Sequence, residues 1–156
     1  MTRTRNIGVS TLAVIGLLLI IGLGYTGWTA YKKAQDRAAF AAAVSSANEK
    51  LDKAKAQWVD ALTIATSTPR IGLAVPITNL QKIRQEVQAL DVPQCLSESK
   101  GHLIKGMNEG LDGMLTFMRN DMHKYELEEF TQNKAKLMAA SFAEYSKKDT
   151  ACPVKK

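Results

Sequence analysis

The hydrophobic positions of this chain form one unbroken apolar run near the N-terminus, followed by stripes of helical period. The run extends from Ile7 to about Ala30 without a charged residue, with two arginines before it and two lysines shortly after it. About 20 apolar residues in a helix span the ~30 Å hydrocarbon core of a bilayer. The run therefore predicts a transmembrane helix over residues 7–31, behind a short cytoplasmic tail of residues 1–6.

The far end of the run predicts a membrane interface, because amphipathic rings prefer the headgroup layer. The residues expected there are Tyr25, Trp28, Tyr31, Lys32 and Lys33. Small residues four apart let two membrane helices approach closely. Gly22, Thr26 and Ala30 form such a face in this chain. The face predicts contact with a partner protein or the formation of a homodimer.

A cleaved signal peptide is the alternative to a permanent anchor. Cleavage requires small residues at the last position before the cut and two residues earlier. For cuts after Ala30 or Ala34, the earlier position holds Trp28 or Lys32, which are too large. The sequence therefore favours an uncleaved anchor.

The first stripe after the run has alternating steps of four and three residues, at Phe40, Val44, Ala47, Leu51, Ala54, Trp58, Ala61 and Ala65. A repeat of 3.5 residues is typical of helices that pack as coiled coils. The stripe predicts one long helix from the membrane to about Thr66, with an alanine-rich seam that could receive a partner helix. Thr68 and Pro69 then end the helix.

Three more stripes of helical period cover residues 73–90, 96–122 and 127–145. Pro76 either opens the first of them or kinks a longer helix that starts near Pro69. The middle stripe carries four glycines, at positions 101, 106, 110 and 113 (Gly101, Gly106, Gly110 and Gly113). These glycines would let a neighbouring helix pack closely. The predicted fold is all-α, a single transmembrane helix followed by an antiparallel bundle of three to four helices over residues 32–152, with a basic tail at 153–156.

The two cysteines, Cys95 and Cys152, flank the last two stripes. If these stripes form an antiparallel hairpin with its turn near Asn120, the cysteines meet at its open end. They have neither the spacing of a zinc site nor a CxxC motif, so a disulfide in an oxidising compartment is predicted. Because basic residues on the two sides of the run nearly balance, the cysteines decide the topology. They place the C-terminal domain in a bacterial periplasm, with the anchor in the inner membrane.

Charge and motifs exclude several functions. The net charge is +6, but basic and acidic residues are interspersed, which argues against a nucleic-acid partner. The catalytic motifs GxSxG, HExxH and the P-loop are absent, and His102 and His123 lie too far apart to act together. We predict no enzyme activity, no cofactor and no metal site. A copper(I) site is the alternative reading of a methionine stripe that otherwise fills the core, Met107, Met114, Met118 and Met122.

Residues 58–118 also carry a resemblance. Its elements are the WxDA at Trp58, the TPRIxLA at Thr68, the LQxIRxE at Leu80, the VPxCL at Val92 and the GM before LxFM at Leu115. This stretch resembles a class of small bacterial envelope proteins that have a helical domain behind an N-terminal anchor or a lipoprotein signal. That class has no established activity, so the resemblance implies location and fold.

These observations predict a non-catalytic accessory or scaffold subunit that docks onto a larger membrane or envelope complex. The segment from Pro69 to Val75 is either a docking surface or a cap of the bundle. Beside the membrane face, the candidate contact residues are Trp58, Arg70, Ile71 and Leu73. Two alternatives stay open. The layout resembles the inner-membrane spanins of phages, which are lysis proteins, and a helical domain of this size could bind a small periplasmic ligand or metal.

Overall fold

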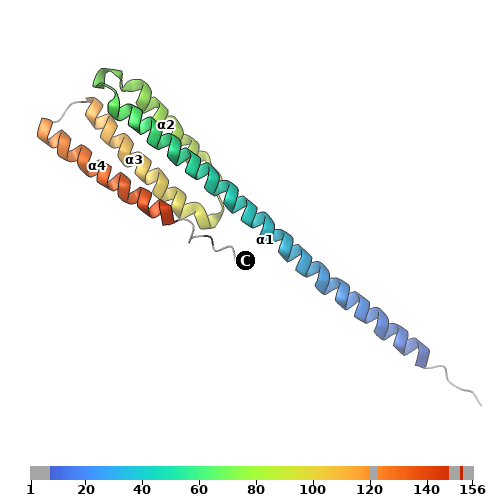
Figure 1. Ribbon diagram of the computed structural model, residues 1–156. Coiled ribbons are helices and arrows are strands. Elements are labelled where there is room, and N and C mark those ends of the chain that lie inside the picture. Colours follow the sequence, from blue (N-terminus) through green and yellow to red (C-terminus); the bar gives the residue numbers. More distant parts are fainter. Residues whose placement is uncertain (1–7, 120–122, 148–151, 153–156) are drawn as a thin grey trace, which may run out of the picture. The chain divides into compact units, whose positions relative to one another are not determined.

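The computed structural model describes residues 8–119, 123–147 and 152, with side chains at Trp28 and from Tyr31 onward. The chain divides into two compact units, Met1–Ala41 and Ala42–Lys156. Every regular element in the described part is helical (Figure 1), which confirms the all-α prediction. The elements are α1 (Gly8–Ser67), η1 (Arg70–Gly72), α2 (Ala74–Ala89), η2 (Gln94–Leu96), α3 (Ser97–Arg119) and α4 (Lys124–Tyr145), where η1 and η2 are short 3₁₀ helices.

Prolines and a capping lysine determine where the helices begin and end. α1 ends at Ser67, because Pro69 cannot donate a backbone hydrogen bond. Pro76 is the third residue of α2, in the first turn, where no donor is required. At the other end of α2, Lys100 Nζ donates to the carbonyl oxygens of Gln88 at 2.8 Å and Leu90 at 2.6 Å. The predicted end of the first long helix is therefore confirmed, and Pro76 opens a separate helix.

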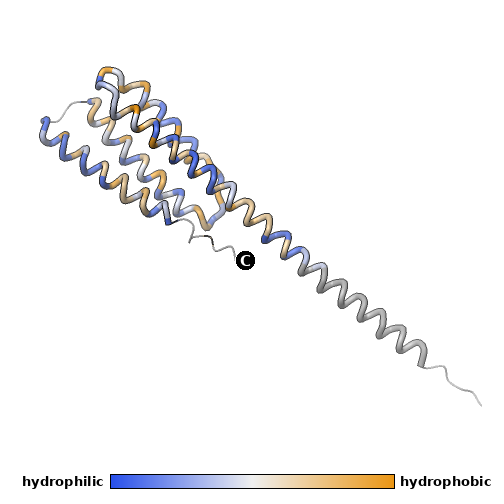
Figure 2. The backbone as a smooth tube through the Cα atoms, viewed as in Figure 1, coloured by the Kyte–Doolittle hydropathy of each residue, from blue (hydrophilic) through white to orange (hydrophobic). Residues whose placement is uncertain are grey.

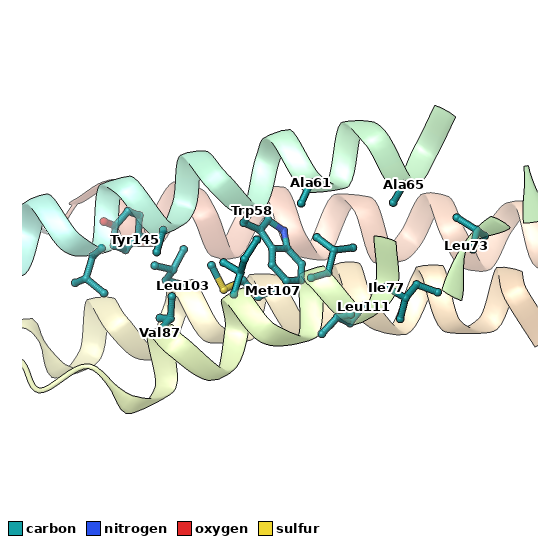
Figure 3. Packing of buried hydrophobic residues seen from close by; sticks show 14 residues of the cluster. Trp58, Ala61, Ala65, Leu73, Ile77, Val87, Leu103, Met107, Leu111 and Tyr145 are labelled. Atoms are coloured by element: carbon teal, nitrogen blue, oxygen red, sulfur yellow. The ribbon is translucent and has the colours of Figure 1, made fainter. Parts of the chain in front are cut away.

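Within the second unit, the part of α1 after Ala42 lies lengthwise beside α2, α3 and α4 (Figure 1). Trp58 is fully buried near the middle of one continuous core (Figure 3). The core draws residues from all four helices: Leu51, Ala54, Trp58, Ala61, Ala65, Leu73, Ile77, Leu80, Ile83, Val87, Leu103, Met107, Leu111 and Tyr145.

The predicted seam of α1 is buried from Val44 to Ala65 at each of its 3.5-residue positions. Its partners are the chain's own helices, since Trp58 and Ala61 share the core with residues of α2, α3 and α4. The expectation that the alanine-rich seam receives a separate protein is therefore corrected. A period of 3.5 residues specifies close helix packing, but it does not specify which helix fills the groove.

Glycines bring α3 and α4 together. A Cβ atom at Gly106 would lie 2.5 Å from the Phe142 ring, and one at Gly110 would lie 3.0 Å from Met138 Sδ. A side chain would clash at Gly106, and at Gly110 it would require Met138 and Trp58 to shift by a few tenths of an ångström, so the predicted role of these two glycines in close packing is confirmed. Gly101 differs, because a Cβ there would meet nothing within 4 Å.

A disulfide joins Cys95 and Cys152, whose Cα atoms are 5.4 Å apart, as predicted. It closes the end of the bundle at which the chain enters from the first unit. A second small cluster of buried residues surrounds this end, formed by Val44, Ala47, Leu96 and Cys152. The turn predicted near Asn120 and the basic tail lie outside the described residues.

The predicted transmembrane helix falls mostly outside the described side chains. The α1 backbone is helical from Gly8, but only Trp28 and Tyr31 have described side chains within residues 7–31. Among the residues that the structure describes, no helix has the length and apolar character needed to cross a bilayer. The anchor therefore stays a prediction of the sequence.

Candidate functional site

The turn from α1 into α2 carries the most exposed aliphatic side chains of the second unit. From Ala61 to Gln81 the sequence has one ionisable side chain, Arg70. Three aliphatic residues there face water: Ile64 is 59% exposed, Ile71 99% and Val75 78%. We call these three residues the apolar corner. Figure 2 shows hydrophobic colour at this turn.

The apolar corner borders a shallow opening of about 590 Å³ between α1 and α2. It is lined by Ile64, Ala74, Val75, Pro76, Thr78, Asn79 and Lys82. A second opening of about 350 Å³ shares Ile64, Asn79 and Lys82 with it and continues toward Glu86. The two helices therefore present a groove that is apolar at the corner and becomes polar away from it.

The hydroxyl groups at this turn are already satisfied within the chain. Thr63 Oγ1 donates to the carbonyl oxygen of Val59 at 2.9 Å, and Thr68 Oγ1 donates to that of Ile64 at 2.6 Å. Ser67 Oγ also donates to Ile64, at 3.0 Å, and Thr78 Oγ1 donates to Ala74 at 2.9 Å. Side chains that bond backward in this way need no water and fill acceptors at the helix end.

The contact residues predicted from sequence divide into two groups. Arg70 and Ile71 are on the surface, and the Arg70 guanidinium lies 5.1 Å from the centre of the Phe117 ring. Trp58 and Leu73 are fully buried, so neither offers a surface to a partner in the folded bundle. We assign both to the core, as a correction.

Sequence reasoning missed Ile64, and it included Val75 only as the end of the segment from Pro69 to Val75, without naming it as a contact residue. A signal for Ile64 was available, because it is a large apolar residue that lies off the seam, between Ala61 and Ala65, so the seam itself does not account for it. Val75 had a weaker signal. It precedes Pro76 at the start of α2, where the first buried residue after Leu73 is Ile77.

The predicted membrane interface is described only in part. Trp28 is 58% exposed and Tyr31 is 65% exposed, and Lys32 Nζ lies 4.8 Å from the centre of the Trp28 ring. Lys33 is exposed as well. The side chains of Tyr25 and of the small-residue face, Gly22, Thr26 and Ala30, lie outside the described residues.

A cluster of three charges joins α3 to α4. Lys134 Nζ donates to Glu109 Oε2 at 2.7 Å and to Asp112 Oδ2 at 3.3 Å. The hydrogen bond to Glu109 raises the pKa of Lys134 above its ordinary value, with partial opposition from burial. All three charges are paired across the helix interface, which indicates a structural role.

The histidines and methionines have local structural roles. His102 Nε2 lies 3.8 Å from Glu98 Oε1, one turn earlier on α3, and the backbone N–H of His123 donates to Glu126 Oε2 at 3.3 Å at the start of α4. Met107 is fully buried in the core, and Met114 and Met118 pack against it. Met122 lies outside the described residues. Among the residues that the structure describes, no group of His, Cys, Asp or Glu could hold a metal ion.

The chain matches no protein-family model, no curated protein and no solved structure.

Proposed function

We propose that this protein is a non-catalytic accessory or scaffold subunit that docks onto a larger membrane or envelope complex. The observation that carries the proposal is the apolar corner. Burying Ile71 and Val75 against a partner would be favourable, while leaving them in water contributes nothing to the bundle's own fold. Exposed apolar patches on otherwise closed domains are typical of interaction sites.

The anchor and the compartment belong to the same proposal. Residues 7–31 hold the chain in an inner membrane, and residues 32–152 fold in the periplasm. The exposed rings of Trp28 and Tyr31 beside Lys32 support this arrangement, because such groups suit the headgroup layer. The disulfide supports an oxidising compartment.

Two surfaces are left for docking, since the α1 seam is occupied by the chain's own helices. One is the apolar corner. The other is the predicted small-residue face within the membrane, Gly22, Thr26 and Ala30. A complex in the cell envelope consists of proteins and the lipid that surrounds them. The apolar corner can therefore dock onto the complex through its lipid as well as through its proteins.

A native pull-down with matched variants tests the proposal. The full-length chain is expressed at its native level and extracted in mild detergent, and co-purifying proteins are identified by mass spectrometry. The double variant I71D/V75D places two charges in the apolar corner, and L137D is the control, because Leu137 on α4 is 41% exposed outside the corner. We expect wild type and L137D to recover the same partner in comparable amounts and the double variant to recover less. A lone monomer in all three preparations would contradict the proposal.

A second candidate, small-ligand binding, is favoured by one observation. An opening of about 120 Å³ with apolar walls lies between α1, α3 and α4, beside Gly110 and Met138. A space of this size suits a molecule of a few atoms, and a bound ligand raises the melting temperature of its protein. Benzene is a suitable probe. A melting temperature that does not change at saturating benzene would remove this candidate.

A further inference from the structure

We infer that the apolar corner binds the surface of a lipid bilayer that contains anionic lipids, with Ile71 and Val75 entering the headgroup layer. This inference rests on the proposed function in treating the corner as a docking surface. It adds the chemistry of what the corner touches. The membrane contact is separate from the predicted anchor, because it uses the end of the bundle opposite the disulfide.

The first argument is the way the aliphatic side chains project. Ile71 is 99% exposed, which means that it contacts almost nothing in its own chain. Val75 follows four residues later and is 78% exposed, and it lines the same opening as Ile64. Side chains that protrude from a turn can enter a soft apolar medium together, and such binding strengthens with the apolar area that is buried.

The second argument is that few polar groups at the turn would lose water on insertion. The hydroxyls of Thr63, Ser67, Thr68 and Thr78 all donate to carbonyl oxygens of α1 or α2, three or four residues earlier in the chain. Pro69 and Pro76 carry no N–H group, at positions where a turn or a helix start would otherwise leave a donor without a partner. A polar backbone group without a partner is costly in a membrane, so this turn is well suited to enter one.

The third argument is charge, and it selects anionic lipid. The ionisable side chains of the turn and its opening are Arg70 and Lys82, and both are basic; Lys82 Nζ also lies 3.9 Å from Glu86 Oε1, one turn later on α2. The nearest carboxylate on α1, Asp60, lines the adjacent opening one turn below Ile64. Long basic side chains around an aliphatic tip can reach phosphate groups while the tip enters the headgroup layer.

A site-specific fluorophore tests the contact in the full-length chain. Ile71→Cys is labelled with an environment-sensitive nitrobenzoxadiazole dye, which the exposure of this position permits, while the native cysteines stay in their disulfide. The chain is held in a non-ionic amphipol, so that no bilayer is present at the start. Phosphatidylcholine vesicles, with or without phosphatidylglycerol, are then added. The same label at Leu137→Cys is the control.

We expect the emission at position 71 to rise and shift to the blue with phosphatidylglycerol vesicles. The response should be weaker with phosphatidylcholine alone and weaker at high salt, while position 137 should not respond. Adding V75D should lower the affinity for vesicles by about tenfold, as the loss of one buried aliphatic side chain implies. Circular dichroism confirms that each variant is folded.

Three results would overturn the inference. A silent label at position 71 with both kinds of vesicle means that the corner does not enter lipid. Equal responses at positions 71 and 137 mean that the bundle adsorbs without using the corner. A response that grows with protein concentration in the absence of vesicles means that a second copy of the chain is the partner. If the label is silent but I71D/V75D still loses its partner in the pull-down, the corner binds protein and the proposed function stands without this inference.

Discussion

The hydroxyl of Tyr145 donates a hydrogen bond of 2.8 Å to Oδ1 of Asp52, and this bond joins the last turn of α4 to α1. The Tyr145 side chain is otherwise part of the core and is only 1% exposed. The disulfide lies at the same end of the bundle. At this end of the bundle, the hydrogen bond and the disulfide therefore both tie α4, whose own apolar stripe is sparse, to the other helices.

Removing this hydroxyl should destabilise the bundle modestly. For Tyr145→Phe we expect a loss of about 1 kcal/mol in the free energy of unfolding, because the ring still fills the core while the bond to Asp52 is lost. Guanidinium unfolding followed by circular dichroism measures the change. Tyr125→Phe is the control, since Tyr125 is 84% exposed. An equal loss in both variants would show that the Asp52 bond contributes nothing.

The glycines of α3 offer a matched pair. Gly106→Ala should destabilise the bundle by about 1–3 kcal/mol, because its new Cβ would lie 2.5 Å from the Phe142 ring. Gly101→Ala should instead stabilise it by up to ~1 kcal/mol, since alanine is the better helix former and nothing lies within 4 Å of that site. Thermal unfolding of the two variants should therefore shift in opposite directions. Shifts of the same sign would mean that α3 and α4 are not in close contact at Gly106.

The sequence predicted most of the bundle because its signals are local. Pro69 ends α1, Pro93 follows α2, and the buried positions of α1 from Val44 to Ala65 are those of the 3.5-residue stripe, whose first predicted position, Phe40, is instead 47% exposed. The disulfide could be predicted because the hairpin of α3 and α4 brings its two open ends together. The helix ends and the stripe depend on residues within one or two turns of each other, whereas the disulfide, which spans 57 residues, followed from pairing the two arms of a hairpin.

The candidate site was harder to predict because exposure depends on tertiary packing. Ile71 and Leu73 are both apolar and lie in the same short segment, yet the first is 99% exposed and the second is fully buried. The path of η1 across the end of the bundle turns one side chain toward water and the other toward the core, and this path is set by tertiary packing. For the same reason Trp58 could be read as a contact residue, although the other helices enclose it completely.

The disulfide should contribute a large part of the bundle's stability. Cys95 and Cys152 are separated by 57 residues, and cross-linking a loop of that size stabilises by about 4 kcal/mol in the chain-entropy model. We expect C95S/C152S to lose about that amount in guanidinium unfolding. As a control, both proteins are also unfolded in the presence of a reductant. The reductant should lower the stability of the wild type by the same amount and leave the stability of C95S/C152S unchanged. A wild type whose unfolding midpoint does not respond to reductant would contradict the prediction.

The bond between Lys134 and Glu109 should make stability depend on pH in the alkaline range. The pKa of Lys134 is raised above its ordinary value of 10.5, chiefly by the hydrogen bond to Glu109. A group whose pKa is higher in the folded state contributes its full stabilisation below the unfolded pKa, and that contribution is lost as the pH rises through the folded pKa. The bond is therefore intact at pH 7 and weakens above about pH 10.5.

Glu109→Gln should then destabilise the bundle at pH 7 by about 1 kcal/mol, because the charged acceptor of Lys134 is lost while the contact to Asp112 at 3.3 Å remains. The difference between variant and wild type should shrink as the pH is raised above about 10.5. Urea unfolding at a series of pH values measures it, and Glu98→Gln, a substitution of an exposed carboxylate on the same helix, is the control. A difference that stays constant across this range would show that the charge of Lys134 does not stabilise the contact between α3 and α4.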